Sequence, residues 1–112
     1  MKLEAGFFEA VTGIKADTIE VEGNTVFYHL GIGMGEINVY EFAHMCKERA
    51  ISYAYIIQSE YEGNNGDVNY AICRIFFDGD EVWNNYDDDF DADSEPEAVI
   101  KAAKWVYDRK EK

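Results

Sequence analysis

Proline, cysteine, basic residues and long apolar runs are all scarce in this sequence. Its 112 residues include one proline, two cysteines and 10 Lys or Arg against 23 Asp or Glu. No apolar run approaches the roughly 18 residues that a membrane-spanning helix needs, so we expect no membrane span. The N-terminus reaches an acid at Glu4 without a hydrophobic signal region, which indicates a cytoplasmic protein. Cys46 and Cys73 are then expected to be free thiols, with one disulfide in a secreted protein as the alternative.

Acidic residues are abundant instead, and they are unevenly distributed. The formal net charge is −13, and residues 78–97 hold ten acids and no base, whereas residues 98–112 hold two acids and five bases. Hydrophobic residues make up 47% and aromatic residues 15%, which is too much apolar surface for a disordered chain. The segment 78–97 repels phosphate, so we expect no direct nucleic-acid or membrane binding, and it attracts basic partners.

Apolar spacing and turn residues predict the elements of the chain. A helix or a strand is expected over 3–11, ending at Gly13, and a hairpin joins 18–22 to 25–30 through Gly23-Asn24. The glycines of residues 31–35 predict a loop, and Asn38 is the expected N-cap of a helix over 39–50. Strands are expected at 53–61, 68–77 and 81–86, with turns at 63–67 and 78–80, and Ser94 caps a last helix that ends near residue 110.

These elements predict one α+β domain over residues 1–112. Residues 1–35 would form an N-terminal segment with a β-hairpin, and residues 36–112 an α-β-β-β-α core. The economical arrangement is a three-stranded antiparallel sheet with two helices packed on one face.

This element order and the spacing Ala98-x-x-x-Ala102-Ala103 resemble the topology of the double-stranded-RNA-binding domain. The segment 94–103 is also similar to the closing helix of phage ABA sandwich proteins, and the helix at 40–48 resembles small phage and prophage proteins. The resemblance implies an α-β-β-β-α fold and a phage or prophage origin. RNA-binding domains of this topology hold phosphates with lysines that open the last helix. Here Glu95, Pro96, Glu97 and Val99 occupy those places, so RNA binding is not supported.

No catalytic, cofactor or metal site is expected from the motifs. Residues 31–35 read GIGMG and lack the spacing of a dinucleotide-binding loop. The aspartate run 87–93 offers oxygen ligands for a cation such as Ca²⁺, but Ala92 and Ala98 occupy the Gly and Glu positions of an EF-hand. A single-ion site and a solvated acidic loop both remain open. Neither His29 nor His44 stands in a pattern that indicates catalysis, so we predict a protein without enzymatic activity.

Aromatic residues interleaved with acids predict a partner-binding surface, although the same aromatics could instead fill the core. The leading hypothesis is a non-enzymatic interaction protein that docks on a basic surface, for example an inhibitor of a host nucleic-acid-handling defence enzyme, such as an anti-CRISPR. The alternatives are an antitoxin-like module bound to a small basic toxin, and a cation-binding protein or enzyme using the aspartate loop. The candidate partner-binding residues are Asp78, Asp80, Glu81, Trp83, Tyr86, Asp87, Asp88, Asp89, Asp91 and Asp93.

Overall fold

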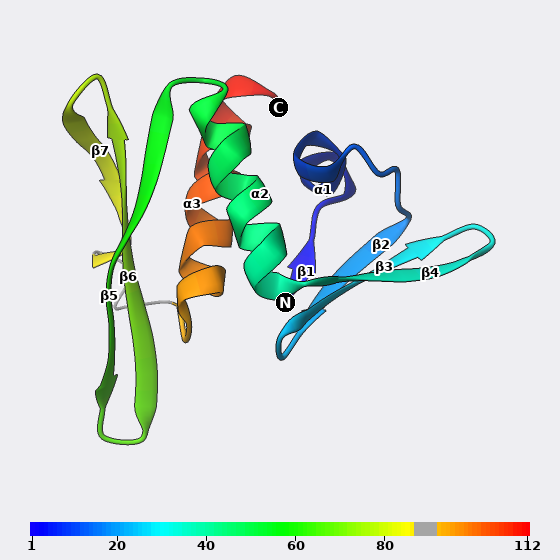
Figure 1. Cartoon of the computed structure of the whole chain (residues 1–112), viewed down its shortest axis with the longest axis horizontal. Helices are drawn as coiled ribbons and strands as arrows, with labels where there is room; N and C mark the ends of the chain where they lie inside the picture. The colour runs from blue at the N-terminus through cyan, green and yellow to red at the C-terminus, as the bar shows by residue number, and fades with distance from the viewer. Residues whose placement is uncertain (87–91) are drawn as a thin grey trace. The chain divides into compact units, whose positions relative to one another are not determined.

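The structure, a computed structural model, describes residues 1–86 and 92–112 (Figure 1). The chain divides into two compact units, Met1–Met45 and Cys46–Lys112, and the boundary falls within helix α2 (Val39–Ile51). Each unit contains its own antiparallel sheet. The single domain expected from the sequence stays a prediction.

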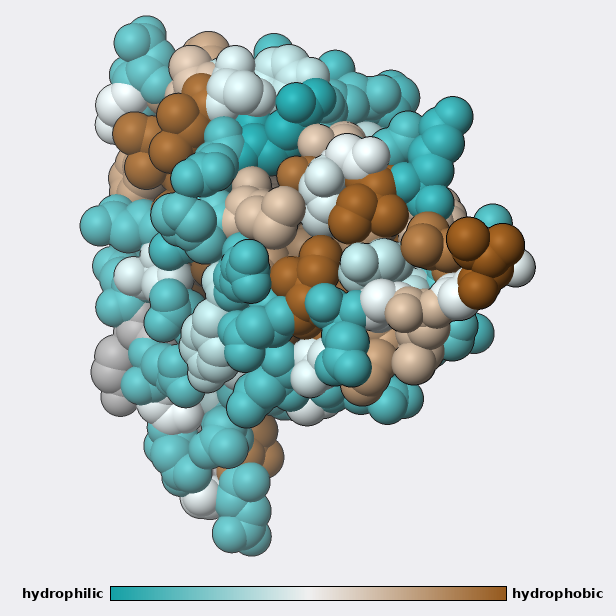
Figure 2. Space-filling model, turned by 45° about the vertical axis from the view of Figure 1, so that its right-hand side comes forward, coloured by the Kyte–Doolittle hydropathy of each residue, from teal (hydrophilic) through white to brown (hydrophobic). Residues whose placement is uncertain are grey.

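The first unit is a four-stranded sheet in the order β1-β2-β3-β4, with a helix α1 (Ala5–Thr12) between the first two strands. All neighbouring strands are antiparallel. Two-residue turns at 23–24 and 31–32 close the hairpins, and Figure 2 shows hydrophobic atoms gathered at the projecting tip of the second. The strands are β1 (Lys2–Leu3), β2 (Thr18–Glu22), β3 (Thr25–Leu30) and β4 (Gly33–Asn38).

One face of this sheet holds the core of the first unit. Side chains alternate between the two faces of a strand, so Ile19 and Val26 share a face with Tyr28. The Tyr28 ring contacts Phe8 of α1 at a centroid distance of 5.3 Å, and Phe8 stacks on Phe42 at 5.7 Å. Phe8 and Val26 are completely buried, so the α1 side of the sheet is the packed side.

The second unit is built on the strands β5 (Tyr55–Asn65), β6 (Val68–Phe77) and β7 (Asp80–Asn84), paired in that order. Helix α3 (Glu95–Lys110) packs on β5 and β6 through its small side chains. The helix begins as predicted, because the Ser94 hydroxyl accepts a hydrogen bond from the Glu97 N–H. Its buried residues are Pro96, Ala98, Val99, Ile100, Ala102, Ala103 and Val106.

The side chain of Asn85, the residue after β7, forms hydrogen bonds with the backbone of β6. Its amide oxygen accepts the Cys73 N–H at 2.9 Å, and its amide nitrogen donates to the Ala71 carbonyl at 2.7 Å. The Ala71 N–H in turn donates to the Ala92 carbonyl at 2.8 Å. Asn85 is only 1% exposed, so its amide satisfies buried backbone groups that water does not reach.

The fold class predicted from the sequence is wrong. The described part of the chain is α+β but has three helices and two antiparallel sheets, not one three-stranded sheet with two helices. The hairpin at 18–30 is confirmed. Of the two alternatives for residues 3–11, the structure has the helix, and Gly13 ends α1 with a left-handed φ of 78°. The error lies in residues 31–35, which were predicted to be a loop: Gly33 begins strand β4, and β1 completes the sheet.

The glycine at 35 is explained by packing. Gly35 lies opposite Tyr28 in the register of β3 and β4. A Cβ added at Gly35 would overlap the Tyr28 ring, whereas a Cβ at Gly33 would meet nothing within 4 Å. The glycine-rich stretch is therefore part of a strand whose backbone an aromatic ring crosses closely.

Replacing Gly35 by alanine should lower the free energy of unfolding by about 1–3 kcal/mol, because the Tyr28 ring must leave its place against Phe8. Urea denaturation followed by circular dichroism measures the change. Gly33→Ala is the matched control and should differ little from wild type; equal losses in the two variants would contradict this account.

Replacing Asn85 by alanine should cost about 2–4 kcal/mol, since the buried Cys73 N–H and the Ala71 carbonyl would both lose their partner. Thermal unfolding of Asn85→Ala beside Asn84→Ala measures it. The Asn84 side chain bonds only at the surface, so its variant should lose far less. A loss at Asn85 no larger than that at Asn84 would refute the role assigned to the buried amide.

Candidate functional site

The predicted partner-binding residues are divided among different surroundings. Asp78 lies in the turn before β7 with a left-handed φ of 53°, and Asp80 begins β7. Trp83 is half-buried opposite Ile75, which is fully buried, so its ring belongs to the packed face of the sheet. Asp93 is exposed just before α3. Asp87, Asp88, Asp89 and Asp91 lie outside the described residues, and with them the predicted aspartate loop.

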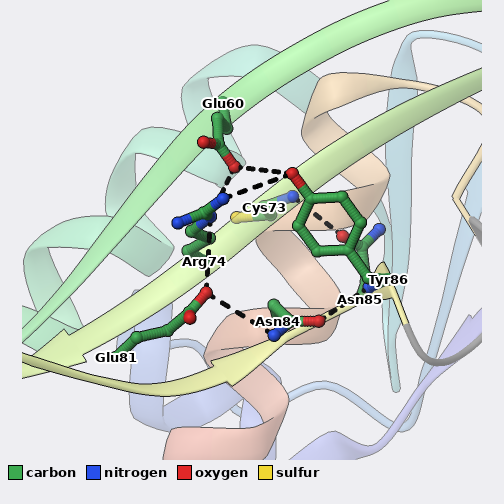
Figure 3. Close-up of polar contacts among 7 residues, drawn as sticks. All are labelled: Glu60, Cys73, Arg74, Glu81, Asn84, Asn85 and Tyr86. Carbon is green, nitrogen blue, oxygen red and sulfur yellow. Dashed lines mark hydrogen bonds and ion pairs between the residues drawn. The ribbon is translucent and has the colours of Figure 1, made fainter.

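Glu81 and Tyr86 are held within the chain by Arg74 of β6 (Figure 3). Arg74 Nε lies 2.5 Å from a carboxylate oxygen of Glu60 and 3.3 Å from one of Glu81. Its guanidinium donates to the Tyr86 hydroxyl at 3.4 Å, and that hydroxyl donates to Glu60 at 3.0 Å. The hydrogen bond to Tyr86 and the charges of Glu60 and Glu81 raise the pKa of Arg74, so the cation is permanent.

Other acids of the predicted segment also have partners in the chain. Glu95 accepts a hydrogen bond from the Ser59 hydroxyl at 3.1 Å. Glu97 accepts from the Asp93 N–H and lies 3.7 Å from Lys101. These acids stabilise the start of α3 and are less available to a partner than their density in the sequence suggests.

A second acidic surface lies on the first sheet, on the face opposite Tyr28. A shallow hollow of about 300 Å³ there is lined by residues of three strands. The strand register brings the lining residues together, because Glu20 of β2 pairs with Phe27 of β3, and His29 of β3 pairs with Met34 of β4. Its lining residues are Glu20, Glu22, Phe27, His29 and Met34. We call this face, together with Glu36 of β4, the outer face of the first sheet.

The carboxylates of the outer face have no cation partner. In the described parts of the chain, no Lys, Arg or His nitrogen lies within 4.0 Å of Glu20, Glu22 or Glu36. Lys2 neighbours Glu20 in the register without forming an ion pair, and the first unit has only two Lys or Arg against seven acids. With three carboxylates and one neighbouring lysine, the outer face therefore carries a net negative charge.

An apolar tip adjoins this face. Ile32 in the turn between β3 and β4 is 101% exposed, Met34 is 58% exposed, and Leu30 is 37% exposed. The tip is the brown projection at the right of Figure 2. Exposed apolar residues that gather beside polar ones are typical of protein interaction sites.

Sequence reasoning missed the outer face, although its signal was present. The alternation in 18–22 and 25–30 predicts the hairpin, and the intervening positions Glu20, Glu22, Phe27 and His29 are those of its second face. Ile32 falls within residues 31–35, for which the glycines predict a loop. A hairpin has two faces, and the residues that alternate with the core define the second one.

The described residues form neither a metal-ligand cluster nor a membrane-spanning helix. Within residues 1–86 and 92–112, no three His, Cys, Asp or Glu side chains lie together as metal ligands. Among the same residues, no helix combines the length and the apolar character needed to cross a membrane. Cys46 and Cys73 are free and buried. Burial raises the pKa of both thiols, to about 12 for Cys73, so neither is a reactive nucleophile.

The buried thiols predict a loss of stability at alkaline pH. The folded chain keeps Cys46 and Cys73 protonated, whereas in the unfolded chain they ionise near the ordinary value of 9.0. Above that pH the unfolded state loses protons first, and stability falls by up to about 1.4 kcal/mol per pH unit for each thiol.

Urea denaturation between about pH 8 and about pH 10.5 tests whether the free energy of unfolding falls as the pH rises. Wild type should lose stability more steeply than the double variant Cys46→Ala, Cys73→Ala, in which the other titrating groups are unchanged. Parallel curves for the two proteins would contradict the assignment.

No family model matches the chain, and comparison with curated proteins and with solved structures likewise found no match.

Proposed function

We propose that this chain is a small acidic interaction module, without enzymatic activity, that docks on a basic surface of a partner protein. The observation that carries the proposal is the outer face of the first sheet. Glu20, Glu22 and Glu36 lie there without cation partners in the described chain, and the fully exposed Ile32 lies in the β3–β4 turn at one end of the same sheet. The net charge of −13 also attracts a basic partner, at longer range than these contacts.

The two parts of this surface would contribute differently. Burying an isoleucine side chain contributes about 1.5–3 kcal/mol, so Ile32 is suited to anchor a partner. Carboxylates around such an anchor contribute mainly to the rate and the specificity of association. Glu20 and Glu22 would therefore select a basic partner that the hairpin tip binds.

The site proposed from the sequence is revised accordingly. Glu81 and Tyr86 are satisfied by Arg74, which leaves Asp78, Asp80 and Asp93 as described acids of that segment with no cation within 4.0 Å. These three would strengthen the negative field. The cation-binding alternative depends on Asp87, Asp88, Asp89 and Asp91, and no described residue bears on it.

The partner proposed from the sequence remains a basic protein surface in the cytoplasm. One form is a phage-encoded inhibitor of a nucleic-acid-handling defence enzyme, with carboxylates in place of phosphates. The other is an antitoxin-like module bound to a small basic toxin. In both cases the partner, a defence enzyme or a toxin, would offer a basic surface to Glu20 and Glu22. The neighbouring gene would distinguish the two cases.

Photo-cross-linking from position 32 tests the proposal. A photoreactive phenylalanine analogue replaces Ile32 in one protein and Val68 in another; Val68 is 61% exposed and lies in the second unit. In a lysate of the source organism, we expect a discrete cross-linked partner from position 32 and not from position 68. The yield should fall severalfold when salt screens the carboxylates, because the Debye length shortens from about 10 Å at 0.1 M to about 3 Å at 1 M.

Matched charge variants complete this test. Glu20→Gln with Glu22→Gln should lower the yield of the cross-link from position 32 severalfold. Glu62→Gln with Asp67→Asn removes the same charge from the second unit and should leave the yield unchanged. A partner captured equally from both positions, or one whose yield does not change with the loss of Glu20 and Glu22, would refute docking through the outer face.

A further inference from the structure

Strand β4 is an unpaired edge of the first sheet. It pairs with β3 alone, through six consecutive residue pairs from Thr25↔Asn38 to Leu30↔Gly33 and without a bulge. Within the described chain, no other segment hydrogen-bonds to its second side between Met34 and Ile37. An unpaired, regular edge is a template for another strand.

The register shows which backbone groups face this free edge. Leu30 and Gly33 flank a two-residue turn and form a hydrogen-bonded pair, so the pairs of β3 and β4 alternate from there. The His29 carbonyl points toward β2, because it accepts the Asp17 N–H at 2.8 Å. Its neighbour Met34 is therefore in a non-hydrogen-bonded pair, and the N–H and C=O groups of Met34 and Glu36 point outward.

The edge also lacks the usual protection against pairing. Proteins block exposed edges with proline, lysine or a bulge. Strand β4 contains none of these and its one charged residue is Glu36, which repels acidic strands but not basic ones, whereas β5 of the second sheet carries a bulge between Ser59 and Tyr61. Gly33 and Gly35 add no side chain of their own on the face that they share, where the Tyr28 ring covers Gly35, so β4 itself presents no β-carbon to a further strand at these two positions.

We infer that an extended basic segment of the partner adds to β4 as a fifth strand, an inference that rests on the proposed function. Charge complementarity selects this occupant. On the outer face, basic side chains of the added strand would lie beside Glu36 and pack their apolar stems against Met34, which is 58% exposed. A second copy of this chain would bring another Glu36 and a net charge of −13 to the same edge.

Amide hydrogen exchange of the full chain tests strand addition directly. The probe is a ten-residue peptide in which arginine alternates with valine, added at millimolar concentration. We expect the outward amides of Met34 and Glu36 to exchange about tenfold more slowly, as for a site mostly occupied, with little change at the inward amide of Gly35. A peptide N-methylated at every backbone nitrogen should give no protection, and neither should one with glutamate in place of arginine.

Variants at the edge separate backbone pairing from side-chain contacts. Met34→Pro removes an outward N–H and should abolish the protection at Glu36, whereas Met34→Thr keeps the N–H and should retain it. Glu36→Gln should weaken binding of the arginine peptide severalfold. Unfolding midpoints near the wild-type value would show that each variant is folded.

Three results would overturn the inference: no protection by the arginine peptide, equal protection by the N-methylated peptide, or protection that rises with protein concentration alone because a second copy occupies the edge. These failures are distinct from failure of the proposed function. If position 32 still cross-links a partner that depends on Glu20 and Glu22 while β4 gains no protection, docking stands and strand addition is wrong.

Discussion

The strand pairing of the first unit depends on one packing contact, in which the Tyr28 ring lies against the backbone of Gly35. The ring is held between Phe8 and strand β4, where any side chain at position 35 would overlap it. This contact fixes the register of β3 with β4. A slip of one residue would exchange the two faces of the strand, so the outward position of Met34 and Glu36 follows from it.

Local signals in the sequence mark one end of each helix, although they leave residues 3–11 open between a helix and a strand. Gly13 ends α1, Asn38 accepts the Tyr40 N–H at the start of α2, and Ser94 caps α3. Each of these signals acts within a few residues of its helix. The role of Gly35 could not be predicted in the same way, because it depends on Tyr28, a neighbour only in the folded sheet.

The charged residues of the candidate site could not be predicted for the same reason, because their partners are distant in the sequence. Counting acids along the chain selects residues 78–97, but availability depends on pairing in space. Arg74 neutralises Glu60 and Glu81 from a different strand, whereas Glu20, Glu22 and Glu36 are dispersed in the sequence and share one face through the strand register. Linear density could not separate carboxylates that stabilise the fold from those that remain open to a partner.

The two hydrogen bonds at Ala71 bear on how this protein can change over evolution. Asn85 binds its carbonyl and Ala92 its N–H, so two residues that follow β7 in the sequence are both held by the same residue of β6. The bond from Ala71 to Ala92 joins backbone groups, so selection can replace either alanine by another side chain that fits and keep the bond. The bond to the Ala71 carbonyl needs the side-chain amide of Asn85, so position 85 is the less free to change.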